Sequence, residues 1–272
     1  MYHVVFVHGV SVRKIPGSDS YDKAKALRHK LFSKHCFRGS ATAYYDPYWG
    51  GDAADLDLDG IFLDMPYGNT LGGADAGEAV RSMTEIWAER LTNSLTPAIA
   101  IFLGDAFVYF HDSPRRERIL EVVRYDLIRA AKGAHEDGGP LVLVGHSQGA
   151  NILYDILSVP QEIDSLSEEL GFRFQPDLFL SVGTQLGLFE ELNLFKSSRS
   201  GVAPRLTSVK KWWHVYNRAD VLSFAAEGIF EGVEQFSIDT GADLSEAHGS
   251  YFDRPIFFQQ LRKQLEISGL VQ

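Results

Sequence analysis

The stretch LVLVGHSQGANILYDIL, residues 141–157, decides how this chain folds. Its first four residues are apolar and predict a buried strand, and the ten residues from Gln148 onward predict a helix. The motif GHSQG lies between them and matches G-x-S-x-G, a sharp strand-to-helix turn. Such a turn lifts Ser147 clear of the sheet, where a base can reach it and a helix N-terminus can support negative charge.

Gly145 and Gly149 stand two residues before and two residues after Ser147. A sharp turn leaves room only for small residues at these positions, and it places the serine in a strained backbone conformation of the kind found at active sites. The alternative is a glycine-bearing turn without chemistry. The flanking strand and helix favour a nucleophile elbow.

Short apolar runs alternate with helical segments along the whole chain. This pattern is typical of a mainly parallel sheet with helices on both faces, so the sequence predicts a single α/β domain over residues 1–272. We expect strands at residues 2–7, 41–45, 141–144, 178–182, 212–216 and 233–238. We expect helices at residues 21–32, 79–91, 98–110, 114–131, 148–157 and 254–266.

Two stretches interrupt the alternation of strands and helices. Residues 47–112 are too long for a simple connection and predict a lid or cap insertion, and residues 184–208 form a second excursion. Long excursions from a compact domain commonly form lids or binding loops. The alternative is a second small hydrophobic layer that binds no ligand.

The base that activates Ser147 can be sought by elimination. Hydrolases with this turn order the triad along the chain as serine, acid and histidine, and only His214 and His248 follow the serine. His214 lies within a predicted strand, where its ring could not reach the elbow. His248 lies in a loop before the last predicted helix, so we expect it to be the base.

The acid of the triad should follow a strand that lies between the serine and the histidine. Asp220 is the first carboxylate after the predicted strand 212–216, and it would fix the tautomer of His248 and stabilise the imidazolium. Asp239 and Asp243, one strand later, are the rival candidates.

An oxyanion hole needs two donors near the serine. The backbone N–H of Gln148, directly after the nucleophile, is expected to be one of them. The loop after the first strand should supply the other, and we assign the Val10 amide, with Gly9 allowing the close turn. His8 and His146 are expected to support these loops by hydrogen bonding.

The segment VFVHG at residues 5–9, the GHSQG motif, Asp220 and His248 together resemble the α/β-hydrolase superfamily, and the resemblance covers nearly the whole chain. Within that superfamily, residues 177–187 are similar to the Gly-Thr/Ser-Pro strand end of lipases and of the GPI-inositol-deacylase-like group, with Gln185 in place of the proline. The resemblance implies a hydrolase fold shortened at its N-terminus by two strands. It also implies an acyl-enzyme mechanism in a serine esterase of the lipase type.

These observations predict a serine hydrolase that cleaves a carboxylic ester of a small molecule or lipid. Because the base must be neutral to accept a proton, kcat/KM should rise with pH as His248 loses its proton. The alternatives are a thioesterase, phospholipase or peptidase with the same triad, or a non-catalytic binding module that retains the hydrolase fold.

Charge and cysteine content exclude several other classes. A formal net charge of −10 argues against a nucleic-acid partner, which requires clustered Lys and Arg. The single cysteine, Cys36, excludes an internal disulfide and a Cys-based zinc cluster, and it favours a reducing, cytoplasmic compartment.

Membrane and metal signals are weak. The first eight residues lack the features of a signal peptide, and the apolar stretch 97–110 is interrupted by Asp105, so no transmembrane segment is expected. Residues 55–60 imitate the start of a calcium loop, but Pro66 stands where that loop needs a glutamate. We therefore expect neither a metal nor a cofactor.

Overall fold

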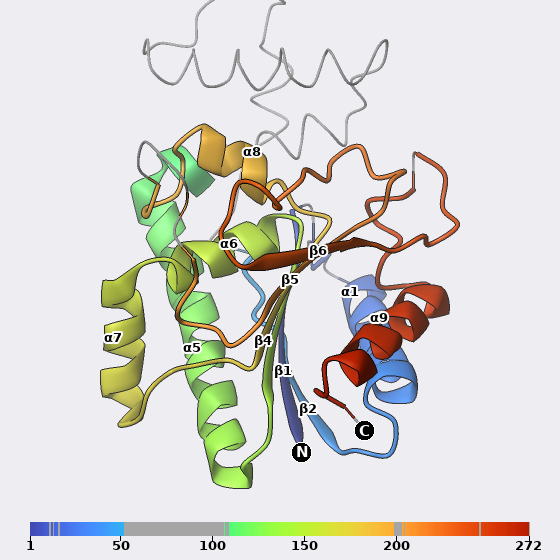
Figure 1. The fold of residues 1–272 in the computed structure, drawn as a ribbon, viewed down its shortest axis with the longest axis horizontal. Coiled ribbons are helices and arrows are strands. Elements are labelled where there is room, and N and C mark those ends of the chain that lie inside the picture. Colours follow the sequence, from blue (N-terminus) through green and yellow to red (C-terminus); the bar gives the residue numbers. More distant parts are fainter. Residues whose placement is uncertain are drawn as a thin grey trace, which may run out of the picture.

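The structure is a computed structural model, and it describes residues 1–10, 12, 14–15, 17–51, 106, 109–198, 203, 205–244 and 246–271. In these ranges six parallel strands form one sheet in the order β2-β1-β3-β4-β5-β6 (Figure 1). The strands are β1 (Tyr2–Val7), β2 (Thr42–Tyr45), β3 (Leu141–His146), β4 (Leu178–Val182), β5 (Trp212–Tyr216) and β6 (Val233–Ser237). The predicted α/β class with a parallel sheet is confirmed.

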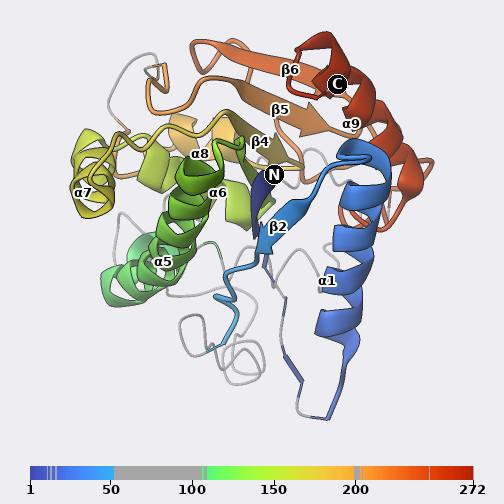
Figure 2. The same cartoon turned by 90° about the horizontal axis from the view of Figure 1, so that it is seen from below.

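Helices cover both faces of the sheet, as predicted (Figure 2). One face carries α5 (Ser113–Asp137) and α6 (Gln148–Leu157), with α7 (Pro160–Leu170) and α8 (Leu186–Glu191) packed on them. The other face carries α1 (Ser20–Leu31), η1 (Phe32–Cys36) and α9 (Pro255–Ile267).

Alternate side chains of the central strands enter two apolar layers. Val5 and Val7 belong to the layer under α5 and α6, whereas Val4 and Phe6 belong to the layer under α1, η1 and α9. Successive side chains of a strand point to opposite faces, and both faces are covered here, so the central strands β1, β3, β4 and β5 are mostly apolar and buried.

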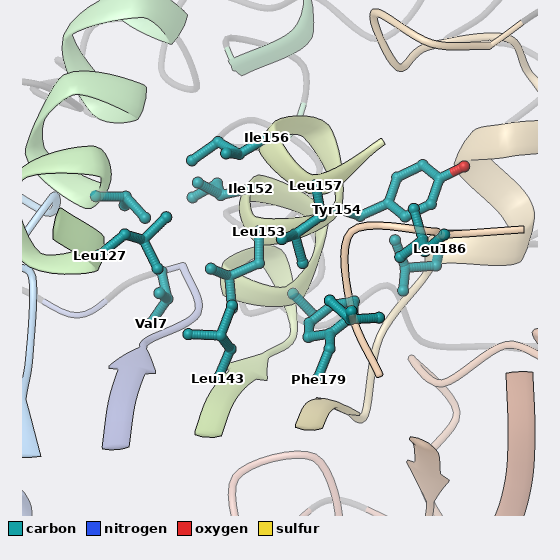
Figure 3. Close-up of a cluster of buried hydrophobic side chains, with 14 of the residues drawn as sticks. Val7, Leu127, Leu143, Ile152, Leu153, Tyr154, Ile156, Leu157, Phe179 and Leu186 are labelled. Carbon is teal, nitrogen blue, oxygen red and sulfur yellow. The ribbon is translucent and has the colours of Figure 1, made fainter. Parts of the chain in front are cut away.

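Helix α6 packs its apolar side directly onto the centre of the sheet. In Figure 3, Ile152 and Leu153 lie over Val7, Leu143 and Phe179, and all five side chains are fully buried. Burial of this kind contributes roughly 1.5–3 kcal/mol for each large aliphatic or aromatic side chain. The helix that follows Ser147 is therefore firmly fixed to the strands on either side of it.

Helix α5 continues six residues beyond the predicted end at residue 131. Asp112 caps its N-terminus by accepting a hydrogen bond from the Arg115 N–H (3.0 Å), and Gly138 ends it in a left-handed conformation (φ 62°). Gly133 lets the helix approach β1, because a Cβ at this position would lie 2.6 Å from the His3 ring.

Three short helical elements were not predicted from the sequence. In η1 the Phe37 N–H donates to the Phe32 carbonyl (3.0 Å), which adds a π-turn after α1. In α7, Leu166 is buried, and Ile163 and Leu170 pack partly buried against the same core. Their i, i+3, i+7 spacing is typical of an amphipathic helix, so a readable signal for α7 was missed. Helix α8 is only six residues long, below the length at which a pattern is readable.

The predicted lid largely lies outside the described residues, as do the helix expected at 79–91, most of the one expected at 98–110, and the calcium-like loop at 55–60. The second excursion is described except for residues 199–202 and 204. Its helix α8 buries Leu186 and Phe189 in the layer around α6. No helix in the described ranges combines the length and the apolar character needed to cross a bilayer.

Candidate active site

Ser147 occupies a strained turn at the carboxyl end of β3. Its backbone has φ 52° and ψ −126°, a left-handed conformation that non-glycine residues rarely adopt. The Ser147 N–H donates to the Val182 carbonyl at the end of β4 (2.9 Å), which fixes the turn against the neighbouring strand. The side chain is almost completely buried.

Glycine is required on either side of Ser147 because other parts of the backbone lie very close to Gly145 and Gly149. A Cβ on Gly145 would lie 2.6 Å from the Ala150 nitrogen, and a Cβ on Gly149 would lie 2.6 Å from the His8 carbonyl oxygen. Both contacts are shorter than any that real Cβ atoms make. The tight turn between β3 and α6 therefore depends on two missing side chains.

The structure brings Ser147, His248 and Asp220 together. The His248 Nε2 lies 3.0 Å from the Ser147 Oγ, and the His248 Nδ1 lies 3.1 and 3.0 Å from the two carboxylate oxygens of Asp220. The three residues follow β3, β5 and β6, and parallel strands all end at the same edge of the sheet. This arrangement has the contacts of a nucleophile, a base and the acid that orients the base.

Asp220 is a buried carboxylate with a full set of donors. Burial by itself would raise its pKa, but the hydrogen bond and charge of His248, the Tyr251 hydroxyl (2.7 Å) and the Leu222 N–H (2.9 Å) hold the pKa below its ordinary value. Asp220 is therefore ionised at neutral pH. An ionised acid at this position fixes the proton of the neutral imidazole on Nδ1 and leaves Nε2 free to accept.

The loop that carries His248 is fixed by hydrogen bonds on two sides. The His146 Nε2 lies 2.9 Å from the His248 carbonyl oxygen, and the Ser250 hydroxyl contacts both the Ala247 carbonyl (3.0 Å) and the Thr240 hydroxyl (2.8 Å). Desolvation, and then the neighbouring His248, lower the pKa of His146 to about 3. His146 is thus neutral at physiological pH, and its Nε2–H donates to the loop.

The loop after β1 lies against the serine. A Cβ on Gly9 would lie 2.9 Å from the Ser147 Cβ, so the backbone of this loop approaches Ser147 as closely as glycine permits. The Gln148 N–H is at the first position of α6, where no intrahelical partner exists. Val10 follows Gly9 and is half-buried, and the role of its amide stays a prediction.

His8 supports the same loop and is itself covered by an aromatic side chain. Its Nδ1 lies 2.8 Å from the Gly9 carbonyl oxygen. The Trp49 ring stacks on the His8 ring with centroids 5.0 Å apart, and the Trp49 Nε1 donates to the His8 carbonyl (2.9 Å). From the sequence, Tyr44, Tyr45, Tyr48 and Trp49 form an aromatic series that could line an acyl pocket or belong to the core. The structure buries Trp49 in the core against His8.

The rival candidates have other partners. The His214 ring is fully buried, with its Nε2 2.9 Å from the Phe224 carbonyl and its Nδ1 3.2 Å from the Ser181 hydroxyl. Burial lowers the pKa of His214 to about 4. Asp239 and Asp243 accept hydrogen bonds from nearby backbone N–H groups, of Gly241 (2.7 Å) and Glu246 (3.1 Å).

Tyr251 is the main site residue that the sequence did not reveal. It is fully buried, its hydroxyl donates to Asp220, and the same hydroxyl accepts the Asn217 N–H (2.8 Å). Burial and then the charge of Asp220 raise its pKa, so it remains a donor at every physiological pH. A tyrosine three residues after a base has no recognised pattern, and no sequence signal could have identified it.

The architecture and the site define an α/β protein with a Ser–His–Asp constellation at the carboxyl edge of its sheet. No family model matches the chain, and no curated protein shows significant similarity to it. Among the residues that the structure describes, no three His, Cys, Asp or Glu side chains are grouped to hold a metal ion.

Proposed function

We propose that the chain is a serine hydrolase of the α/β-hydrolase type that cleaves a carboxylic ester through an acyl-enzyme intermediate. The observation that carries this proposal is the pair of contacts made by His248, to the Ser147 Oγ and to the Asp220 carboxylate. The strained backbone of Ser147 supports it, because such strain is retained chiefly at functional sites.

In the proposed reaction, His248 takes the hydroxyl proton of Ser147 while the Oγ attacks the carbonyl carbon of the ester. The Gln148 N–H, with the Val10 N–H, stabilises the oxyanion of the tetrahedral intermediate. His248 then gives its proton to the departing alcohol, and the acyl group remains on Ser147. A water molecule, deprotonated by His248, attacks the acyl-enzyme and releases the acid with the serine restored.

A fluorophosphonate probe tests the proposal, because it phosphonylates only serines that are activated as nucleophiles. We expect mass spectrometry to find the probe on Ser147 of the folded protein. The Ser147→Ala variant should take up no probe, whereas the control Ser33→Ala, which removes an exposed serine hydroxyl, should react like the wild type. Folded wild-type protein that stays unlabelled would favour a non-catalytic binding module.

The substrate class needs a separate measurement. A panel of p-nitrophenyl esters of increasing chain length, lysophospholipids, acyl-CoA thioesters and peptides compares the ester hydrolase with the thioesterase, phospholipase and peptidase alternatives. We expect the highest kcat/KM on a carboxylic ester, and none on peptides. Preference for short chains would contradict a lipase-like substrate.

A further inference from the structure

A buried polar network lies behind the candidate triad. Its members are Gln148, Asn151, Thr184 and Gln185, none of which exposes any surface to solvent. The Asn151 Nδ2 donates to the Gln148 Oε1 (3.0 Å) and to the Gln185 Oε1 (3.3 Å), and the Thr184 hydroxyl donates to the Asn151 Oδ1 (2.8 Å). Buried amides carry a high cost unless they are paired, so their retention here requires a reason.

The network reaches the loop that carries Asp220. The Gln185 Nε2 donates to the Leu222 carbonyl (2.6 Å), and the Leu222 N–H donates to the Asp220 Oδ1 (2.9 Å). The Phe224 N–H also donates to the Thr184 carbonyl (3.0 Å). Two residues of the turn after β4 therefore bind the backbone of the acid loop.

The Leu222 carbonyl fixes which way each side-chain amide group of the network is oriented, oxygen or nitrogen. The Leu222 carbonyl can only accept, so the Gln185 Nε2 must face it and the Gln185 Oε1 must face Asn151. Asn151 then presents its Nδ2 to Gln148, which must receive it on Oε1. The orientation of the first residue of α6 is thus coupled to the backbone of the acid loop.

Gln185 stands where lipases with a Gly-Thr/Ser-Pro strand end have a proline. A proline has no side-chain polar group and could make neither the bond to Leu222 nor the bond from Asn151. The residue that departs from the expected motif is therefore the one that connects the acid loop with the helix of the nucleophile.

We propose that Gln185 is a positioning residue, which fixes the Asp220 loop relative to Ser147 through the Leu222 carbonyl and Asn151. The inference rests on the proposed function, because it assigns Gln185 a part in orienting the triad. The side-chain partners of Gln185 are Asn151 and the carbonyls of Gly183 and Leu222, so it acts on Asp220 through the backbone of residues 220–222.

The test compares the rate of fluorophosphonate labelling of Ser147 in three variants. Gln185→Leu keeps the approximate volume and removes the side-chain hydrogen bonds to the Leu222 and Gly183 carbonyls and from Asn151. We expect labelling to slow by roughly 10- to 100-fold, as small misplacements of catalytic groups do. Gln259→Leu makes the same change on the exposed side of α9 and should label like the wild type. Circular dichroism shows whether each variant is folded.

The conservative variant Gln185→Glu adds a readout that a packing role would not produce. A neutral carboxyl group can donate to the Leu222 carbonyl and accept from Asn151, and both burial and the ionised Asp220 nearby favour its neutral form. We expect labelling close to that of the wild type at pH 6. Relative to the wild type it should fall toward pH 9, because the ionised carboxylate loses its donor.

A double-mutant comparison separates positioning from general packing. If Gln185 acts through the acid, then Gln185→Leu should slow labelling much less in an Asp220→Asn background than in the wild type. An equal slowing in both backgrounds would overturn the proposal, as would an unchanged rate in Gln185→Leu or a flat relative pH profile in Gln185→Glu.

Hydrogen exchange distinguishes a failure of this inference from a failure of the proposed function. In Gln185→Leu the amides of residues 217–226 should exchange faster, while those of α9 should not change. This readout needs no activity. If the wild type stays unlabelled but Gln185→Leu exchanges faster, the proposed hydrolase function and the part of Gln185 in orienting a triad are both overturned, while its contact with the acid loop is retained. If the wild type is labelled but exchange in Gln185→Leu is unchanged, only the positioning role is overturned.

Discussion

Tyr251→Phe removes one oxygen atom from beneath the candidate acid. That hydroxyl donates to the Asp220 carboxylate (2.7 Å) and accepts the Asn217 N–H (2.8 Å). A hydrogen bond to a charged group contributes about 1.5–3 kcal/mol, and a buried N–H left unpaired costs about 1–3 kcal/mol. The two effects share one atom and do not simply add, so we expect the free energy of unfolding to fall by roughly 2–4 kcal/mol.

Thermal and urea unfolding measure this loss. For a chain of this size each kcal/mol lowers Tm by about 2–4 °C, so Tyr251→Phe should melt roughly 4–16 °C below the wild type. The matched control is Tyr2→Phe, which removes a single hydrogen bond from a half-buried hydroxyl to the Leu270 carbonyl (2.9 Å). It should lose only about 0.5–1.5 kcal/mol.

The pH dependence of the loss identifies its cause. The folded protein holds the pKa of Asp220 below the ordinary value of 3.8, so the stability from its ionised form is complete above that value and is lost as pH falls through the folded pKa. Removing the Tyr251 donor raises the folded pKa. The difference in free energy of unfolding between the variant and the wild type should therefore be constant from pH 6 to 8 and should become smaller below about pH 4.

The same variant should label more slowly with fluorophosphonate, because the acid has lost one of the groups that fix it. A Tyr251→Phe protein that melts with the wild type and labels at the wild-type rate would refute the account of the Asp220 environment. If the difference in free energy of unfolding instead becomes larger on acidification, the loss of stability does not come from the Asp220 carboxylate.

Three further outcomes are expected. Gly149→Ala should lower the free energy of unfolding by at least about 1–3 kcal/mol and abolish most fluorophosphonate labelling, because the added Cβ would collide with the Val7 and His8 carbonyls. Thermal unfolding measures the loss, and a variant as stable as the wild type would contradict the tight turn. His146→Leu removes the donor to the His248 carbonyl, so labelling should slow on the order of tenfold while the fold persists, and an unchanged rate would count against a fixed base loop. Burial raises the pKa of Cys36, so iodoacetamide at pH 8 should modify this thiol only after urea is added.

The central strands could be predicted from the sequence because they are buried on both faces. The bounds of β1, β4 and β5 agree with the expected ranges, since each is a mostly apolar run that can be recognised without its partner strands. Helix α5 runs past its expected end at residue 131 and includes Gly133, whose missing side chain allows the close approach to His3. That contact joins residues 130 positions apart and leaves no local pattern.

Only those site residues that the order of residue types along the chain identifies could be predicted. The order of serine, acid and histidine singled out Ser147, Asp220 and His248, and the structure places these three side chains in hydrogen-bond contact. Their catalytic roles stay predictions. Tyr251 and Gln185 could not be found in this way, because each acts through a hydrogen bond between loops that meet only in the folded protein.

The position of β1 in the sheet affects how the chain can fold while it is being synthesised. This strand lies between β2 and β3, and its register with β3 begins at the pair His3 and Leu141. At a ribosomal speed of about 5–20 residues per second, the growing polypeptide presents an apolar strand with one flank unpaired for roughly 7 to 27 seconds. Chaperones that shield nascent apolar segments have that interval in which to act.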